Sequence, residues 1–353
     1  MKRPRHGLWA GLLLAVLLFG GLSFATDRSF TLGTLKADKG QMQSGFLTVP
    51  EKDGVGTSIP VTIINGAKPG KVLVLTAGVH GYEYPPVLAL YRIKGLIDPN
   101  KLSGTLVLVH IANLPSFQKR TIYYNPVDGK NLNRVFPGDL KGTLCQRIAY
   151  VLHEEVIKKC DALIDLHCGD GNEALIPYSY WMITENKALD QETKDMALAF
   201  GLKYIIIDTT KAKDLAQSVY LANTALIEGK PAITTESGYL GRADEESIGR
   251  NVKGILSVMK LFKMIEGKPT GVADPVWIDE FEVVNSKFSG LFYPRVEMGA
   301  KVTPGELVGI VKDYLGNLKE EVRAPFEGTI LYIIGTPPAN KGEPLFEVGR
   351  LKK

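Results

Sequence analysis

The stretch Lys71-Val72-Leu73-Val74-Leu75-Thr76-Ala77-Gly78-Val79-His80-Gly81-Tyr82-Glu83-Tyr84-Pro85-Pro86 changes pattern midway. Its first nine residues are an apolar run rich in Val and Leu, which predicts a buried strand, and the two prolines that close it are typical of the first turn of a helix. Similar strand and helix patterns alternate as far as Glu236. This alternation predicts an α/β fold with a mixed, mostly parallel sheet flanked by helices. The strands are expected at residues 71–79, 105–112, 162–167, 204–208 and 232–236, and the helices at 85–97, 143–159, 186–200, 215–228 and 244–265.

Polar residues follow three of these strands at the point where each ends. His80 follows the first, Asp165-Leu166-His167 ends another, and Glu236 ends a third. In open α/β sheets, ligands bind outside the carboxyl ends of the strands. The sequence therefore predicts that His80, His167 and Glu236 meet at one edge of the sheet.

The residue types at this edge predict a metal site. Catalytic zinc commonly takes two His and one Glu and leaves a position for water or substrate, and His80, Glu83 and His167 supply that set. Glu236 is the candidate base that takes a proton from water and delivers it to a leaving amine. The alternatives are an ordinary surface pair for His80 and Glu83 and a capping or ion-paired role for Glu236. Gly78 and Gly81 are expected to let the backbone turn sharply beside His80 and to leave room for substrate.

A polar segment from Arg120 to Gly138 is too long for a simple connection. Loops of this length in compact domains are usually functional or disordered, and its aromatic residues argue against disorder. Its arginines suit capture of a carboxylate, the alternative being a surface loop with ion-paired arginines. Two further histidines are interpreted as structural, and three aromatic residues after His167 either line a pocket or pack in the core. These residues are His110, His153, Tyr178, Tyr180 and Trp181.

The N-terminus has a basic start, an apolar run over residues 8–22, and Ser23-Phe24-Ala25. This pattern predicts a signal peptide over residues 1–25 and a periplasmic or secreted protein, the alternative being an uncleaved anchor. The net charge of +4 falls to +1 without the three basic residues of the leader, which gives no electrostatic reason to expect nucleic acid or an anionic membrane as partner. After cleavage no membrane span is expected. Cys145 and Cys160 fall near opposite ends of one predicted helix, about 22 Å apart, too far for a disulfide.

Beyond Gly267-Lys268-Pro269-Thr270-Gly271 the pattern changes from helix to strand. We expect a catalytic domain at residues 26–270 and a small all-β barrel-sandwich domain at 275–353. This tail resembles the biotinyl/lipoyl carrier domain. The expected hairpin tip, residues 313–317, reads Asp-Tyr-Leu-Gly-Asn and has no attachment lysine. The tail is therefore interpreted as a structural domain and not as a carrier arm.

Four motifs in order carry a further resemblance. These motifs are residues 78–83, the run Asn131-Leu132-Asn133-Arg134-Val135-Phe136-Pro137-Gly138, Asp165-Leu166-His167 and Thr235-Glu236-Ser237-Gly238. Together they resemble the succinylglutamate desuccinylase/aspartoacylase family of the zinc carboxypeptidase superfamily. The resemblance spans nearly the whole chain after the leader. It implies a zinc-carboxypeptidase-like fold with one Zn²⁺ per chain.

By this resemblance, His80, Glu83 and His167 match the zinc ligands and Glu236 matches the general base. Arg120 matches the arginine that polarises the scissile carbonyl, and Asn133 with Arg134 matches the pair that grips the free carboxylate of the substrate. The sequence departs from the family at Asn131, where relatives often carry an Asp that orients a zinc-bound His. An amide still accepts the imidazole N–H but adds no negative charge, so the ligand becomes less basic.

Together these features predict an exported zinc hydrolase that cleaves an amide or ester bond of an N-acyl amino acid or a related small carboxylate. One alternative keeps the chemistry but acts on peptides or cell-wall fragments. A second is a zinc-binding protein without catalysis. The leader favours an exported substrate, because cytoplasmic amino-acid catabolism does not need one.

Overall fold

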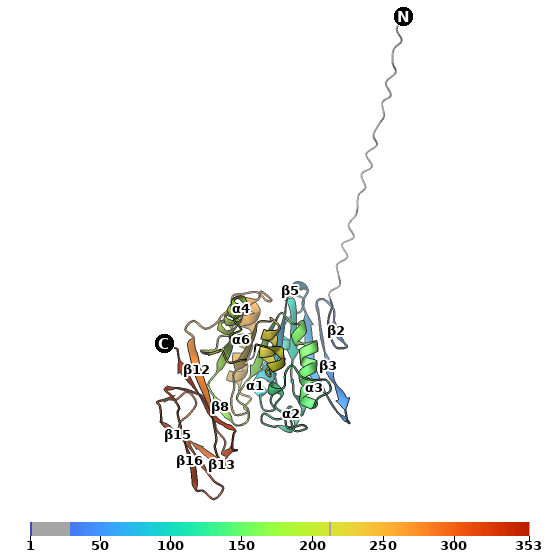
Figure 1. Cartoon of the computed structure of the whole chain (residues 1–353). Coiled ribbons are helices and arrows are strands. Elements are labelled where there is room, and N and C mark those ends of the chain that lie inside the picture. Colours follow the sequence, from blue (N-terminus) through green and yellow to red (C-terminus); the bar gives the residue numbers. More distant parts are fainter. Residues whose placement is uncertain (2–28, 212, 353) are drawn as a thin grey trace.

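The computed structural model describes residue 1, residues 29–211 and residues 213–352 (Figure 1). The predicted signal peptide therefore lies outside the described residues, apart from Met1. Among the described residues, no helix is long and apolar enough to cross a membrane.

Thirteen of the described strands form one mixed sheet. Strands β6, β5, β7 and β11 run parallel to one another, and so do β12, β10 and β9; the two groups meet antiparallel where β11 pairs with β9. Along the sheet the strands are β3 (Gln41–Lys52), β4 (Val55–Asn65), β6 (Ser103–Val109), β5 (Lys68–Thr76), β7 (Ala162–His167), β11 (Ala232–Glu236), β9 (Tyr178–Met182), β10 (Tyr204–Asp208), β12 (Val276–Asn285), β19 (Pro344–Leu351), β17 (Gly328–Ile334) and β14 (Lys301–Val302), with β8 (Glu173–Leu175) beside β17. A short hairpin, β1 (Phe30–Leu32) with β2 (Leu35–Ala37), precedes them.

Helices cover both faces of this sheet, which confirms the predicted fold class. Helices α1 (Tyr84–Leu96), α4 (Lys187–Phe200) and α6 (Glu245–Leu261) pack on one face through Leu90, Phe200 and Val258. Helices α3 (Leu144–Glu155) and α5 (Leu221–Ile227) pack on the other. A short helix, α2 (Leu114–Lys119), leads into the polar loop, which holds the 3-10 turn η1 (Leu132–Arg134). A further 3-10 turn, η2 (Ile157–Lys159), follows α3.

Two predicted helices are wrong in extent: the helix expected over residues 143–159 ends at Glu155 and is followed by η2, and another begins later than expected. The segment expected as a single helix over residues 215–228 is a 3-10 turn, η3 (Leu215–Gln217), followed by extended backbone, and α5 begins only at Leu221. The new start has a long-range cause, because the backbone N–H of Leu221 donates to Oδ1 of Asn133 at 2.8 Å. A side chain from the polar loop thus satisfies a donor at the helix N-terminus that the helix itself leaves unpaired.

The tail is all-β, as expected. Its described part holds a second, antiparallel sheet, made of β13 (Gly290–Pro294), β15 (Leu307–Lys312), β16 (Leu318–Arg323) and β18 (Pro338–Ala339). This sheet packs on β14, β17 and β19 around an apolar core that includes Phe292, Val311 and Phe346. The structure adds that the tail continues the main sheet: β12 pairs with β10 on one side and with β19 on the other. Figure 1 shows the red and orange tail at one end of the molecule and the blue strands β2 and β3 at the other.

The three cysteines are buried free thiols. This confirms that Cys145 and Cys160 form no disulfide with each other, although Cys160 lies beyond the end of α3 and not on the same helix as predicted.

Candidate metal centre and active site

His80 and Glu83 belong to the sharp turn between β5 and α1. Gly78 has φ +65°, and a side chain at Gly81 would place its Cβ 2.4 Å from the backbone oxygen of Thr121. The turn expected at the glycines is confirmed, but the space at Gly81 holds the polar loop and not substrate. Glu83 is the N-cap of α1, so the turn, and not a helical face, brings the two side chains together.

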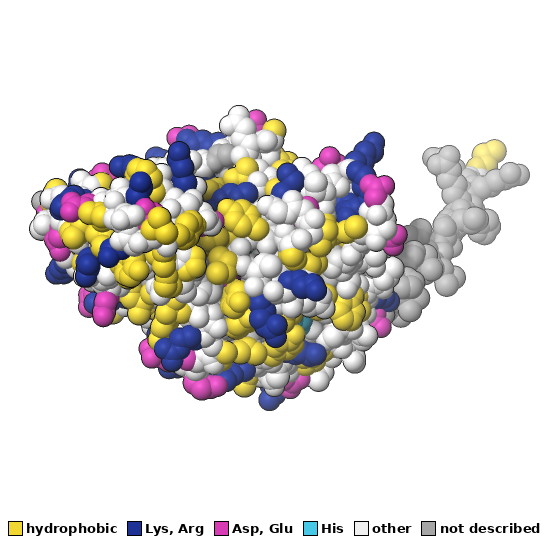
Figure 2. All heavy atoms as spheres, turned by 90° about the horizontal axis from the view of Figure 1, so that it is seen from below, with side chains coloured by type: hydrophobic (Ala, Val, Ile, Leu, Met, Phe, Trp, Pro, Cys, Tyr) yellow, Lys and Arg dark blue, Asp and Glu magenta, His cyan; other side chains and the backbone are white. Residues whose placement is uncertain are grey.

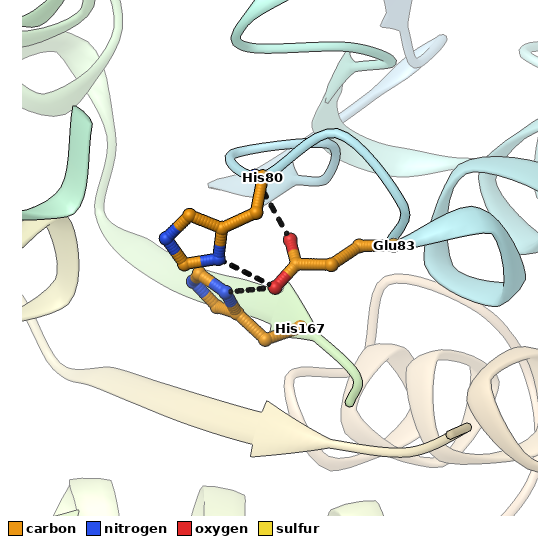
Figure 3. A group of neighbouring side chains, drawn as sticks. All are labelled: His80, Glu83 and His167. Carbon is orange, nitrogen blue, oxygen red and sulfur yellow. Dashed lines mark hydrogen bonds and ion pairs between the residues drawn. The ribbon is translucent and has the colours of Figure 1, made fainter. Parts of the chain in front are cut away.

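Three side chains converge here in the arrangement that a metal ion needs. Nδ1 of His80 and Nδ1 of His167 each lie 2.8 Å from Oε1 of Glu83, and one potential ligand atom from each residue lies within 4.8 Å of the others. Figure 3 shows both imidazoles pointing at the same carboxylate oxygen. Two nitrogens and one carboxylate oxygen are a donor set that suits zinc, so the residues present fit the ion that the sequence predicts.

Other polar groups fix the orientation of both imidazoles. Nε2 of His80 lies 3.1 Å from Oδ1 of Asn131, and Nε2 of His167 lies 3.0 Å from Oδ2 of Asp165. Each oxygen can accept a hydrogen bond from Nε2–H, which leaves Nδ1 to bind a metal ion once its own proton is lost, as the outer partners of metal-binding histidines do. Asp165 is in turn fixed by the Thr76 hydroxyl, which donates to its Oδ1 at 2.7 Å.

Charges are strongly coupled in this cluster. Burial opposes ionisation of all three groups, but mutual attraction outweighs it, so the pKa of Glu83 falls far below its usual range and the pKa values of His80 and His167 rise. A cationic environment of this kind holds Glu83 ionised at all pH values near neutrality. Glu83 is thus ready to act as an anionic ligand.

Replacing Asn131 with Asp is expected to raise metal affinity by about 10-fold, since an anionic acceptor makes the His80 imidazole more basic. The Asp keeps an acceptor for both His80 and the backbone N–H of Asn133, which bonds Oδ1 of Asn131 at 2.8 Å. Competition for zinc with a chromophoric chelator at pH 7.5 measures the change. Asn100→Asp, which adds the same charge at an exposed turn, is the matched control, and equal affinities for all three proteins would contradict the expectation.

Glu236 stands beside the metal cluster. Its strand β11 pairs in register with β7, so that Glu236 is the direct partner of His167, and on the other side it pairs with Tyr178 of β9. Burial raises the pKa of Glu236 well above its usual value, and the carboxylates of Glu83 and Glu173 add to the rise while His167 opposes it. A carboxyl whose pKa is raised holds a proton more readily than an ordinary one, which suits a group that must take up a proton from water.

These groups open into a cavity of about 600 Å³. The polar loop, the ends of β7 and β11, strand β9 and the tail all contribute to its walls. Its lining includes His80, Glu83, Tyr123, Asn131, Asn133, Arg134, His167, Cys168, Glu173, Tyr178, Tyr180, Lys211, Tyr220, Glu236, Phe281, Val283, Asn285, Tyr332 and Glu347. The thiol of Cys168 donates to the backbone oxygen of Gly169 and is not in the metal cluster.

The predicted substrate residues fall in two places. Arg134 lines the cavity with its guanidinium 4.6 Å from the ring centre of Tyr220 and one N–H group on the backbone oxygen of Asn133. Asn133 also lines it, but its side chain bonds Leu221 and lies 3.3 Å from Nε2 of His167. Arg120 is exposed at the end of α2 with φ 53° and is not among the lining residues. The role of Arg120 stays a prediction.

Tyr123 and Glu173 are among the site residues that were not expected from the sequence. The Tyr123 hydroxyl donates to Oε1 of Glu173 at 2.8 Å, and its backbone N–H donates to Asp170 at 2.8 Å. Tyr123 has φ 58°, a sparsely populated conformation for a non-glycine residue, so the bonds hold a locally unfavourable backbone. Aromatic residues in a long loop were the available signal for Tyr123, whereas the pattern around Glu173 offered none.

The open alternatives for the aromatic and histidine residues are resolved. Tyr178 and Tyr180 line the cavity, whereas Trp181 points away from it and packs on Trp277. His110 bonds the Thr62 hydroxyl and His153 bonds Glu228, both away from the cavity lining. The structural interpretation of the two histidines is therefore confirmed.

The fold and the cluster define a class, namely mixed α/β proteins with a candidate metal centre where parallel strands end. Residues 69–262 match the family model of the succinylglutamate desuccinylase/aspartoacylase catalytic domain. The chain belongs to this family.

Individual relatives agree with that assignment. The N-alpha-acetyl-L-2,4-diaminobutyric acid deacetylase of Halomonas elongata is 28% identical over 301 residues, which cover 82% of this chain and 86% of the relative. A solved succinylglutamate desuccinylase of Silicibacter sp. TM1040 superposes with a TM-score of 0.78 at 25% identity, covering 88% of this chain and 95% of that one. The product-bound ectoine utilization protein EutE (DoeB) of Ruegeria pomeroyi gives 0.78 at 26% identity, with the same coverage.

Proposed function

We propose that the protein is a zinc-dependent amidohydrolase that removes the acyl group from an N-acyl amino acid. The observation that carries the proposal is the pairing of Glu236 with His167 across β11 and β7, which sets a candidate base beside the cluster of His80, Glu83 and His167. The names of the relatives support hydrolysis of acylated amino acids.

In this proposal, His80, Glu83 and His167 hold one Zn²⁺ per chain. The bound ion supplies a Lewis acid that polarises the scissile carbonyl and makes water more acidic. Glu236 accepts a proton from the attacking water and delivers it to the departing amine. Arg134 binds the free carboxylate of the substrate in a fork geometry, while Asn133 accepts the backbone N–H of Leu221 and fixes the start of α5 beside it. Arg120 is proposed to stabilise negative charge on the carbonyl oxygen.

A substrate panel tests the proposal. Purified protein with measured zinc content is assayed against N-acetyl and N-succinyl amino acids, including Nα-acetyl-2,4-diaminobutyrate, and against short peptides and cell-wall fragments. Release of free amino acid from the acylated compounds, lost on metal removal and restored by Zn²⁺, is the expected result. Cleavage of peptides alone favours the carboxypeptidase alternative, and zinc binding without any turnover favours the non-catalytic one.

We also propose that the protein is exported, on the strength of residues 1–25 of the sequence. Mass spectrometry of the protein purified with its leader is expected to find a mature chain that starts at Thr26.

On the face seen in Figure 2, acidic and basic side chains are interspersed, and hydrophobic ones gather over the tail and its junction with the main body. On this face, the distribution gives no electrostatic reason to propose nucleic acid as partner.

A further inference from the structure

The tail supplies one wall of the cavity through a single face of its sheet. Phe281, Val283 and Asn285 alternate along β12, as residues on one face of a strand do, and all three line the cavity. Glu347 of β19 is the direct cross-strand partner of Val283 on one side and of Tyr332 on the other. Direct partners point to the same face, so Glu347 and Tyr332 face the cavity together.

Glu347 is an unusual residue for such a wall. The residue is 1% exposed, yet among the described residues its side chain has a single hydrogen-bond partner, the Tyr178 hydroxyl, which donates to Oε2 at 3.3 Å. In the described part of the chain, no cation forms an ion pair with Glu347, and the nearby Lys211 is paired with Asp208 at 2.6 Å. Buried carboxylates are normally paired with a cation or a metal, so this one lacks the partner its charge requires.

A second polar group at the same place lines the cavity without a hydrogen-bond partner among the described residues. Tyr332 is 8% exposed and lines the cavity, and its hydroxyl makes no hydrogen bond to any described residue. Burial, with a contribution from the Glu173 carboxylate, raises the pKa of Glu347 to about 8 against the opposing bond from Tyr178. Such a group gains strongly when a cation arrives beside it.

We infer that Glu347, with the hydroxyls of Tyr178 and Tyr332, binds an ammonium group of the substrate. An ammonium group has three donors, which match one carboxylate oxygen and two hydroxyl oxygens. Arg134, which lines the same cavity, is then available to bind the free carboxylate of the substrate. The inference rests on the proposed function and narrows its substrate to N-acylated diamino acids, whose side chain carries a free amine. Glu347 and Tyr332 then act as specificity residues that the tail contributes.

Binding of the amino acids themselves tests the inference without requiring turnover. Calorimetry on the zinc-loaded protein compares L-2,3-diaminopropionate, L-2,4-diaminobutyrate, L-ornithine and L-lysine with the analogue of each in which a methyl group replaces the amine. At least one amine is expected to bind on the order of 100-fold more tightly than its methyl analogue, because the analogue leaves the buried carboxylate unpaired. The Glu347→Gln variant is expected to lose most of that preference.

Two further variants complete the design. Tyr332→Phe removes one acceptor without changing shape and is expected to reduce the preference by roughly 10-fold. Glu282→Gln makes the same change as Glu347→Gln on the opposite, exposed face of β12 and is expected to leave the preference unchanged. Equal binding of amines and methyl analogues by the parent, or an undiminished preference in both cavity variants, would overturn the inference. Hydrolysis of neutral N-acetyl amino acids in the same preparation would show that the proposed function survives that outcome.

Discussion

Replacing Glu236 with Gln is expected to lower kcat by about 10³-fold while the zinc content per chain stays that of the parent. Gln has the shape of Glu but cannot accept the proton that the attacking water must lose. The β11–β7 pairing that holds position 236 beside His167 involves only backbone groups, so the metal cluster keeps its geometry. Zinc analysis and initial rates on the best substrate of the panel measure the two quantities separately.

Two comparisons separate the base from the metal. Parent protein stripped of metal is expected to lose activity and to regain it with added Zn²⁺, whereas added Zn²⁺ does nothing for Glu236→Gln. Glu282→Gln, outside the cavity, should hydrolyse at the parental rate. A Glu236→Gln protein that keeps full activity with zinc bound would remove Glu236 from the reaction.

Replacing Glu347 with Gln is expected to stabilise the protein, most strongly at pH 8 and above. Burial raises the pKa of Glu347 from its ordinary 4.5 to about 8. Above pH 4.5, folding must therefore either protonate this carboxyl or bury its charge, and both lower the free energy of unfolding. This penalty is absent below pH 4.5, grows as the pH rises to about 8, and is constant above that value. At one pKa unit per 1.36 kcal/mol, its full size is on the order of 5 kcal/mol.

Thermal unfolding at pH 5 and pH 8.5 checks this expectation. Near pH 5 the parent and Glu347→Gln should melt at similar temperatures, and at pH 8.5 the variant should melt roughly 5 °C higher. Gln keeps an oxygen to accept the Tyr178 hydroxyl, so the change removes charge and not the hydrogen bond. Glu282→Gln is the control for loss of one surface charge. A Glu347→Gln protein less stable than the parent at pH 8.5 would mean that the carboxylate has a stabilising partner.

The metal cluster could be predicted from the sequence because each of its residues follows a strongly apolar strand. The apolar runs at residues 71–76 and 162–167 can be recognised as buried strands. Because β5 and β7 pair in parallel, they bring His80 and His167 to one edge of the sheet. Glu236 is found in the same way, because β11 pairs with β7 in parallel. Position at the end of a strand was therefore enough for His80, His167 and Glu236, which lie far apart in the chain.

The rest of the site depends on contacts that no local pattern encodes. Glu347 and Tyr332 reach the cavity only because β12 joins β10, and that pairing between residues far apart in sequence has no periodic signature. The start of α5 at Leu221 depends on Asn133, 88 residues earlier in the chain. Helical propensity over residues 215–228 depends on local sequence alone and carries no information about such a contact. The sequence therefore predicted one uninterrupted helix.

The continuity of the sheet bears on how short a working version of this protein can be. Tyr204, Ile205 and Ile206 of β10 pair with Val276, Trp277 and Ile278 of β12. A chain that ends near residue 270 would leave β10 as a bare edge strand of apolar residues, which is a template for aggregation. The segment that matches the family model, residues 69–262, is thus not an independent unit for expression: its solubility depends on a strand that begins 14 residues beyond its end.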